Sequence, residues 1–320
     1  MAANENGRGR TASAPQHIPV KGWRDIAMRV LGSFNTDRVP FTAAGVTFFV
    51  LLALVPTLTA FVSIYGLFAD RATVVDHVSL LSGVIPADGL QLISDQLERV
   101  AGEGNTALSW SLLISLAIAL WSSSAGVKGM FQAMNIAYGE EERRNFLIFN
   151  GLALLFTLAF AVTAVLVVGI VVVIPSILSI FPLGGLSEWL IRIASFALLV
   201  AVVLIGLAML YRFGPSRSQA RWRWITPGAA LAVLLTLVVS VLFSWYVANF
   251  GNYNATYGSL GALIGLLTWT WISTIIVILG AEVDSEIEHQ TARDTTTGPE
   301  VPLGERGAYV ADTVGKRAGS

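Results

Sequence analysis

Cysteine is absent from the 320 residues, and histidine occurs only three times. Without cysteine sulfur, the chain has no disulfide, thiolate metal site, iron–sulfur cluster or cysteine nucleophile. The sequence also lacks the HExxH, GxxxxGK[ST], GxSxG and His-x-His-x-Asp-His patterns, so common hydrolase, nucleotide-binding and metallonuclease motifs are missing. These absences predict that the protein is not an enzyme and uses neither a cofactor nor a catalytic metal.

Charged residues are scarce as well: they make up 13% of the chain, whereas 54% is hydrophobic and the mean hydropathy is +0.68. Average soluble proteins contain about a quarter charged residues. The deficit is concentrated, because the 58 residues between Arg223 and Glu282 carry no charge. This pattern indicates a membrane protein. The formal net charge of −1 excludes a bulk electrostatic attraction to nucleic acid.

Six apolar stretches are long enough to cross a bilayer. A helix rises 1.5 Å per residue, so about 20 residues span the hydrocarbon core. The stretches are Phe41–Phe68, Ala107–Ser124, Phe146–Ile174, Trp189–Tyr211, Ile225–Phe250 and Tyr257–Val283. We therefore predict an all-α, polytopic membrane protein with six transmembrane helices. The 40 residues before the first stretch contain no short apolar core followed by a cleavage site, so we expect no removable signal peptide.

Lysine and arginine residues predict the orientation, because positively charged loops resist translocation. With the N-terminus inside, 17 of the 20 cations are cytoplasmic, and only Arg71, Arg99 and Arg192 lie outside. The 17 are Arg8, Arg10, Lys21, Arg24, Arg29, Arg38, Lys128, Arg143, Arg144, Arg212, Arg217, Arg221, Arg223, Arg293, Arg306, Lys316 and Arg317. Both termini are thus predicted to be cytoplasmic.

Three domains are expected: a disordered tail (1–20), a six-helix membrane domain (21–288) and a second disordered tail (289–320). The C-terminal tail is rich in Thr, Gly, Ala and charge and has no apolar periodicity. Ahead of the first span, helical spacing groups Trp23, Ile26, Ala27, Val30, Leu31 and Phe34 on one face. This face predicts an amphipathic helix in the inner-leaflet interface, with a helix packed on the bundle as the alternative.

Polar residues near the spans are candidates for a solute pathway, because polar side chains are costly in lipid. Asn135 and Tyr138 follow the second span, and Asn252, Asn254 and Tyr257 lie in the predicted outer turn between the last two spans. The alternatives are a helix leaving the membrane for the first pair and a tight hairpin for the second group, since asparagine tolerates positive φ.

Small residues in the last span predict close helix packing. Gly258, Gly261 and Gly265 include a small-xxx-small spacing that allows two helix backbones to approach closely. The partner helix is either in the same bundle or in another subunit of a homo-oligomer, and the sequence leaves both open.

Four carboxylates, Glu282, Asp284, Glu286 and Glu288, follow at the cytoplasmic end of the last span. Like charges at i, i+4 spacing repel, and the helix dipole disfavours anions at a C-terminus. We therefore expect Glu282 and Asp284 to belong to an inner gate in which some carboxylates pair with arginines of the neighbouring loops. The arginines considered are Arg143, Arg144, Arg221 and Arg223. The alternative is a solvated helix end.

Two remaining patterns have simpler interpretations. His17, His77 and His289 fall on opposite sides of the membrane in the predicted topology, so they cannot share a metal. Arg221 to Trp224 alternate basic and aromatic residues, as single-strand nucleic-acid binders do. A juxtamembrane anchor accounts for that run better, so no nucleic-acid partner is predicted.

Three runs together carry a resemblance to a known family. They are AAGVTFFVLLALVPTL (43–58), WSSSAGVKGMFQAMNIAYGEEERR (121–144) and FGNYNATYGSLGALIGLLTWTWISTIIVILGAE (250–282). Over residues 20 to 290 the chain resembles the YihY/virulence factor BrkB family, often labelled ribonuclease BN. The resemblance implies a bacterial plasma (inner) membrane protein and no catalytic residues. Asn135, Tyr138, Asn254, Tyr257, Gly258 and Gly261 match positions featured in the family pattern.

The architecture favours a transporter or translocase of a lipid-like or amphipathic solute. Six spans divide into three plus three, with halves that start on opposite sides, as an inverted repeat requires. Spans one, two, three, five and six lack buried charge, which argues against proton or ion coupling. The alternative is a non-transporting scaffold for envelope partners, and a ribonuclease is least favoured. The expected partners are therefore the lipid bilayer, a lipid or amphipathic solute and further copies of the chain.

Overall fold

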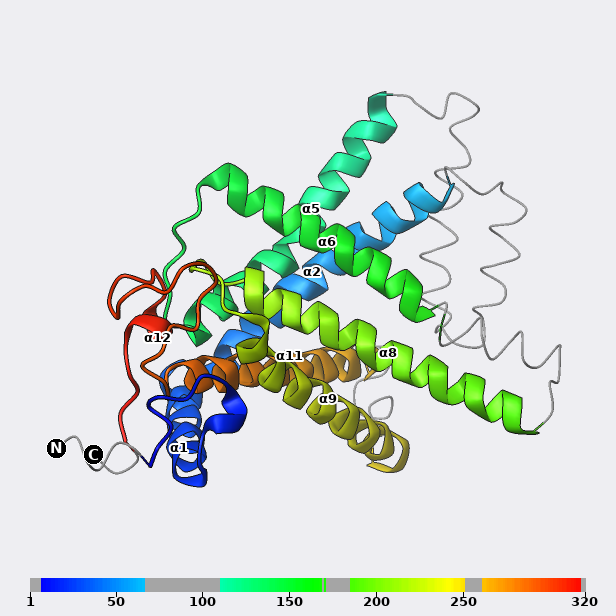
Figure 1. Ribbon diagram of the computed structural model, residues 1–320. Helices are drawn as coiled ribbons and strands as arrows, with labels where there is room; N and C mark the ends of the chain where they lie inside the picture. The colour runs from blue at the N-terminus through cyan, green and yellow to red at the C-terminus, as the bar shows by residue number, and fades with distance from the viewer. Residues whose placement is uncertain (1–6, 67–109, 169, 171–184, 251–260, 318–320) are drawn as a thin grey trace. The chain divides into compact units, whose positions relative to one another are not determined.

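The computed structural model describes residues 7–66, 110–168, 170, 185–250 and 261–317. Within these ranges the chain is helical and has no strand, apart from one isolated bridge between Ala220 and Thr296. The helices are η2 (Pro15–His17), α1 (Val20–Thr36), α2 (Val39–Gly66), α5 (Trp110–Ala137), α6 (Phe146–Val168), α8 (Gly185–Phe213), α9 (Trp222–Phe250), α11 (Gly261–Glu288) and α12 (Tyr309–Asp312) (Figure 1). The predicted all-α class is confirmed for this part of the chain.

Four helical segments are long and apolar enough to cross a membrane: Phe146–Ala164, Gly185–Phe213, Trp222–Val247 and Leu263–Glu288. A fifth arises if α1 and the start of α2, which meet at 59°, form one broken span. Only 11–22% of each apolar window is buried, so most of these side chains face outward, as a lipid-facing helix requires. The described residues thus contain four or five candidate spans, compared with six predicted from the sequence.

The chain divides into two compact units, each described separately. Unit 2 comprises Phe48–Lys128 and Phe146–Ala161. In this unit α5 comes close to α2 at Gly126, where an added Cβ would lie 3.3 Å from Cγ2 of Val50. The hydroxyls of Ser123 and Ser124 donate to the carbonyl oxygens of Leu120 and Trp121 in their own helix. Small side chains that are hydrogen-bonded within their own helix therefore permit close packing of α5 and α2 here.

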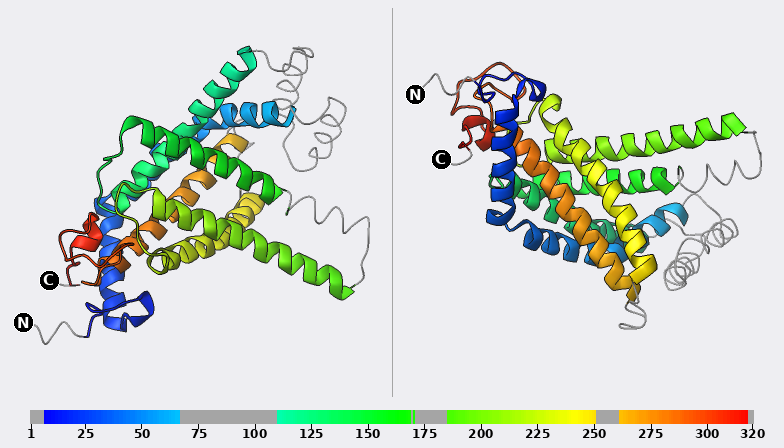
Figure 2. Two further views of the ribbon diagram at one scale, coloured as in Figure 1. Left: turned by 45° about the horizontal axis from the view of Figure 1, so that its top comes forward. Right: turned by 90° about the horizontal axis from the view of Figure 1, so that it is seen from below.

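Unit 1 comprises Met1–Thr47, Gly129–Asn145 and Val162–Ser320. Its centre is α11, which packs against α9 on one side and α1 on another, while α8 packs against α9 (Figure 2). The α9–α11 crossing is tight at Gly228 and Gly280, because a Cβ on Gly228 would overlap the carbonyl oxygen of Gly280. At Gly265 an added Cβ would meet nothing within 4 Å. The close small-residue contact thus lies nearer the end of α11 than the sequence suggested.

Helix α1 buries a mixed face against α11. Ile26 and Val30 join a core with Trp224 and Ile287, whereas Leu31 of the predicted apolar face is 64% exposed. Asp25 is also buried, because Arg8 donates to both of its carboxylate oxygens at 2.6 Å. The structure therefore shows the helix packed on the bundle, the alternative that the sequence left open.

The two terminal segments differ from the disordered tails expected at 1–20 and 289–320. Their described parts lie side by side at the α1 end of unit 1 (Figure 1). The Ala292 amide donates to the Arg10 carbonyl oxygen at 2.8 Å, and the Arg10 guanidinium donates to that of Gly315 at 2.6 Å. These segments are therefore ordered by hydrogen bonds to distant backbone groups. Such contacts leave no periodic pattern in the sequence, so they could not be predicted from it.

Candidate functional site

The candidate site is the acidic end of α11, where buried carboxylates meet four other segments of unit 1. Glu282 is 1% exposed, Asp284 and Glu288 are 0% exposed, and Glu286 is 8% exposed. Burial of a carboxylate is costly unless hydrogen bonds or an opposite charge compensate it. The four side chains therefore cannot form the solvated helix end that was the alternative interpretation.

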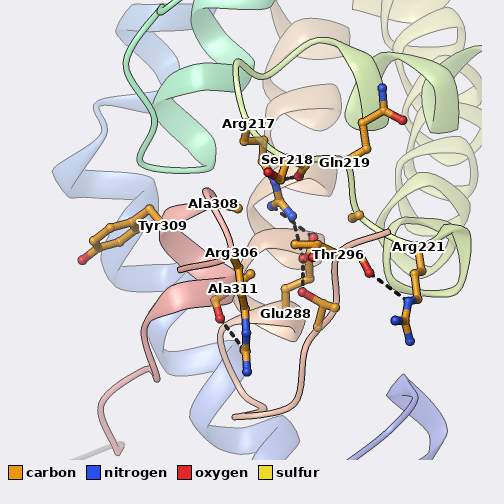
Figure 3. A network of polar contacts seen from close by, with 12 residues as sticks. Arg217, Ser218, Gln219, Arg221, Glu288, Thr296, Arg306, Ala308, Tyr309 and Ala311 are labelled. Carbon is orange, nitrogen blue, oxygen red and sulfur yellow. Dashed lines mark hydrogen bonds and ion pairs between the residues drawn. The ribbon is translucent and has the colours of Figure 1, made fainter. Parts of the chain in front are cut away.

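Glu288 forms the most deeply buried ion pair of the site. Arg217 binds it through two N–H groups, at 2.8 and 3.2 Å, and the two side chains are 2% and 0% exposed (Figure 3). The Thr295 hydroxyl donates to the same carboxylate at 2.7 Å. The guanidinium also lies 5.0 Å from the ring centre of Tyr138. Burial alone would lower the pKa of Arg217, but Glu288 raises it overall, so the arginine stays charged.

Asp284 binds the backbone of α9 rather than a cation. Its Oδ1 accepts the Gly228 N–H at 2.6 Å. Gly228 follows Pro227, which lacks an N–H and disturbs the helical hydrogen bonds around it. The other oxygen, Oδ2, is buried without a hydrogen-bond partner among the described residues. Asp284 therefore fastens α11 to the proline-containing start of α9.

Glu286 links α11 to α1 and to the C-terminal segment. It forms an ion pair with Arg29 at 2.5 Å, and the side chains are 11% and 13% exposed. Arg29 also donates to Oε1 of Gln290 at 2.8 Å and to the Lys316 carbonyl oxygen at 3.0 Å. One arginine thus joins three segments that are far apart in the sequence.

Glu282 faces another carboxyl group, that of Asp37 in the break between α1 and α2. The two carboxyl groups are close enough to interact electrostatically, which disfavours their ionisation at the same time. Burial raises the pKa of Asp37, with Glu286 adding to the effect and the Glu282 hydrogen bond opposing it. Oε1 of Glu282 has no hydrogen-bond partner within the described ranges. Glu282 therefore adjoins a second carboxyl group at the α1–α2 break rather than a cation.

The arginines at the site differ from the four expected from the sequence. Arg144 instead binds Glu142 at 2.6 Å, and Arg221 donates to the Thr296 carbonyl oxygen at 2.9 Å. The actual partners, Arg29 and Arg217, belonged to the predicted cytoplasmic set. Sequence reasoning missed Arg29 because it is 257 positions from Glu286, and neither periodicity nor loop adjacency indicates that contact. Arg217 lies in the same loop as Arg221, but nothing in the sequence distinguishes it as the partner of Glu288.

Asn135 and Tyr138 lie at this site and are buried. Asn135 accepts the Ser216 N–H at 2.7 Å and donates to Glu142 at 3.1 Å, which positions the loop that carries Arg217. Tyr138 is 1% exposed, and burial raises its pKa well above the usual value. The other predicted pathway residues, Asn252, Asn254 and Tyr257, lie outside the described residues, as does Gly258 of the packing set.

The C-terminal segment also borders the site and contacts Arg29 of α1 through the Lys316 carbonyl oxygen. The Arg306 guanidinium donates to the carbonyl oxygen of Ala311 at 2.6 Å (Figure 3). It also donates to the carbonyl oxygen of Ala292 at 2.9 Å. The Asp312 carboxylate accepts N–H groups from Gly304, Arg306, Gly307 and Ala308. Burial would raise the pKa of Asp312, but these amides lower it overall. The segment contributes Thr295 to Glu288 and was not anticipated as part of a site.

Comparisons with known proteins agree with a membrane location. The family model described as Virulence factor BrkB matches residues 30–303. A ribonuclease-like protein of Bacillus subtilis, YfkH, is 29% identical over 76% of this chain and 88% of its own length. A UPF0761 membrane protein of Pseudoalteromonas translucida is 23% identical over 87% and 90%, and one of Neisseria meningitidis serogroup B is 28% identical over 82% and 63%. No solved structure matches the chain.

Proposed function

This chain belongs to the virulence factor BrkB family of membrane proteins, and from that premise we propose that it transports or translocates a lipid-like or amphipathic solute. The observation that carries the proposal is the buried charged network at the end of α11. Four carboxyl groups terminate an otherwise apolar helix, and their partners come from α1, α9, the loop before α9 and the C-terminal segment. Ionisable groups of this kind in membrane proteins commonly mark solute pathways.

The network supports a role as an inner gate. Of the two predicted gate residues, Asp284 fastens α11 to α9, and Glu282 lies beside Asp37 at the α1–α2 break. Separation of α1 from α11 would require loss of the Arg29–Glu286 pair, which is less buried than the Arg217–Glu288 pair. We therefore assign the opening movement to α1 and the fixed support to the loop that carries Arg217.

The proposed topology has six transmembrane helices in a bacterial inner membrane, with both termini cytoplasmic. The cation distribution supports this orientation, because 17 of 20 lysines and arginines then lie inside. Helix α1 would lie at the inner-leaflet interface, where exposed Trp23 and Leu31 contact lipid while Ile26 and Val30 pack on the bundle. An outer opening would then be formed near Asn252, Asn254 and Tyr257.

Fluorescent-phospholipid translocation in proteoliposomes tests this function. The wild type should transfer lipid faster than empty vesicles, and Asn252→Ala/Asn254→Ala should reduce the rate. Asn249→Ala is the matched control, because that amide donates to the Trp245 carbonyl oxygen of its own helix and is exposed. Transfer no faster than in empty vesicles would reject phospholipid translocation.

The second candidate is a non-transporting scaffold for envelope partners. It is favoured by the exposed apolar side chains of Leu303 (49%) and Tyr309 (53%) on the folded C-terminal segment. Arg306 and Asp312 hold that segment in place, so it offers a preformed surface rather than a flexible tail. Leu303→Ser/Tyr309→Ser should then remove co-purifying partners and leave lipid translocation unchanged, whereas retention of every partner would reject this candidate.

We propose that neither role involves catalysis, a cofactor or nucleic acid. The ribonuclease-like name belongs to the Bacillus protein. Within the described residues, no group of three or more His, Asp or Glu side chains is arranged to hold a metal ion. RNA turnover that survives stringent purification and depends on an added metal would overturn the proposal.

A further inference from the structure

A small pocket lies at the elbow between α1 and α2, in the segment that also carries Asp37. It encloses about 280 Å³ and is lined by Phe34, Asn35, Arg38, Pro40 and Phe41. The elbow is braced from α11, because the Trp271 indole N–H donates to the Pro40 carbonyl oxygen at 2.8 Å. The pocket therefore has a defined wall at the point where α2, the expected first span, begins.

Arg38 has an unusual backbone conformation, and no ion pair to its guanidinium is found among the described residues. Its φ of 50° makes it the one non-glycine residue with positive φ in the described ranges. That conformation is unfavourable for an L-residue and persists where the surrounding structure or a function requires it. The side chain is exposed and has no ion pair among the described residues, whereas Arg29 and Arg217 are committed to carboxylates.

The neighbouring Asp37 does not neutralise this charge. Its carboxyl group interacts with Glu282 of α11, burial raises its pKa, and it forms no ion pair with Arg38 in the described ranges. Glu286, the other carboxylate near Asp37, is already paired with Arg29. Arg38 therefore supplies a net positive charge to the pocket.

The rest of the lining is suited to the glycerol and acyl region of a lipid. Phe41 is 78% exposed and Phe34 is half-buried, so aromatic surface lies beside the guanidinium. Arginine binds phosphate oxygens through a planar fork of N–H donors, and amphipathic or aromatic side chains are typical of the membrane interface. We infer that this elbow binds the phosphate headgroup of an anionic phospholipid of the inner leaflet. The lipid is a bound ligand, independent of whether the protein transports lipid.

Binding of phosphatidylglycerol to the purified full-length protein in neutral detergent, counted by native mass spectrometry, tests this inference. Asn tolerates positive φ, so Arg38→Asn removes the charge without straining the backbone. We expect this variant to bind about tenfold more weakly, the effect of losing a charge-assisted hydrogen bond. Arg24→Asn is the control, because Arg24 is an exposed arginine of α1 outside the pocket, and it should change binding by less than about twofold.

A second variant separates the headgroup from the apolar wall. Phe41→Ala keeps the charge and should weaken phosphatidylglycerol binding while leaving inorganic phosphate binding unchanged. Equal losses in Arg38→Asn and Arg24→Asn would show diffuse electrostatic attraction and overturn the inference. Equal binding of phosphatidylcholine, or displacement of the lipid by an equal concentration of inorganic phosphate, would also overturn it.

Discussion

Two arginine–glutamate pairs in unit 1 show how the same chemistry differs with its surroundings. Arg217 and Glu288 are 2% and 0% exposed and come from different segments, whereas Arg192 and Glu188 are 60% and 35% exposed and lie one turn apart on α8. Exposed pairs contribute about 0–1 kcal/mol, but removal of one partner from a buried pair costs about 3–5 kcal/mol. The comparison indicates that the ion pair at the end of α11 stabilises unit 1 more than the exposed pair on α8 does.

The largest expected effect comes from breaking the buried pair. Arg217→Ala leaves Glu288 buried with only the Thr295 hydroxyl, so it should lower the free energy of unfolding by about 3–5 kcal/mol. Arg217→Lys keeps the charge but loses the two-pronged contact and should cost less. Denaturation in detergent measures both variants. If Arg217→Ala lowered the free energy of unfolding no more than removal of an exposed arginine does, the Arg217–Glu288 pair would not be a main support of unit 1.

Crowding the α9–α11 crossing should have the next largest effect. Gly228→Ala would push a Cβ into the Gly280 carbonyl oxygen and against Asp284, so it should destabilise the protein by about 1–3 kcal/mol. Gly265→Ala is the matched control in α11, where the added methyl meets nothing within 4 Å and helix propensity improves. Thermal unfolding compares them, and equal effects would show that the crossing is not tight.

Acid should loosen the C-terminal segment before it disrupts the apolar helices. The pKa values of Asp294 and Asp312 are lowered: burial opposes the shift, and hydrogen bonds to each carboxylate outweigh it. Their stabilisation is therefore present above the unfolded-state pKa and is lost as the pH falls through the folded-state values. Hydrogen exchange at residues 301–312 should increase below about pH 4. Asp312→Asn should show the same increase at pH 7 and cost about 1 kcal/mol.

The smallest effect should come from the exposed pair. Arg192→Ala breaks only an i, i+4 contact on α8 and should change the free energy of unfolding by about 0.5 kcal/mol or less. At high salt even this difference should disappear, because salt screens exposed charges. Urea denaturation at low and high salt measures it. A cost comparable with that of Arg217→Ala would remove the distinction between the two regions.

Apolar runs predict the helices of this protein better than they predict its site. The expected spans at Trp189–Tyr211 and Ile225–Phe250 differ from α8 and α9 by four residues or fewer at any end, and α9 ends at Phe250 as expected. Long apolar segments adopt helices with few alternatives in lipid. The acidic end of α11 was recognised as a place where cations must gather. Its location could be read from charge alone.

The partners at that end could not be read from the sequence, because long-range contacts determine them. Arg306 is buried among carbonyl oxygens of a segment with no apolar periodicity, so composition suggested disorder. Asp284 binds the N–H of Gly228 next to Pro227, a contact that requires knowledge of the α9–α11 crossing. Close packing was predicted at Gly258, Gly261 and Gly265, but an added Cβ at Gly265 meets nothing within 4 Å, and the tight positions are Gly228 and Gly280.

The central claim, that the charged end of α11 gates solute movement, is tested most directly by translocation rates of two matched variants. Glu286→Gln weakens the contact between α1 and α11, whereas Glu188→Gln neutralises a comparable but exposed acid on α8. In proteoliposomes with equal amounts of folded protein, Glu286→Gln should increase phospholipid transfer several-fold and Glu188→Gln should leave it unchanged. Identical rates for wild type and both variants would contradict a gate at this site.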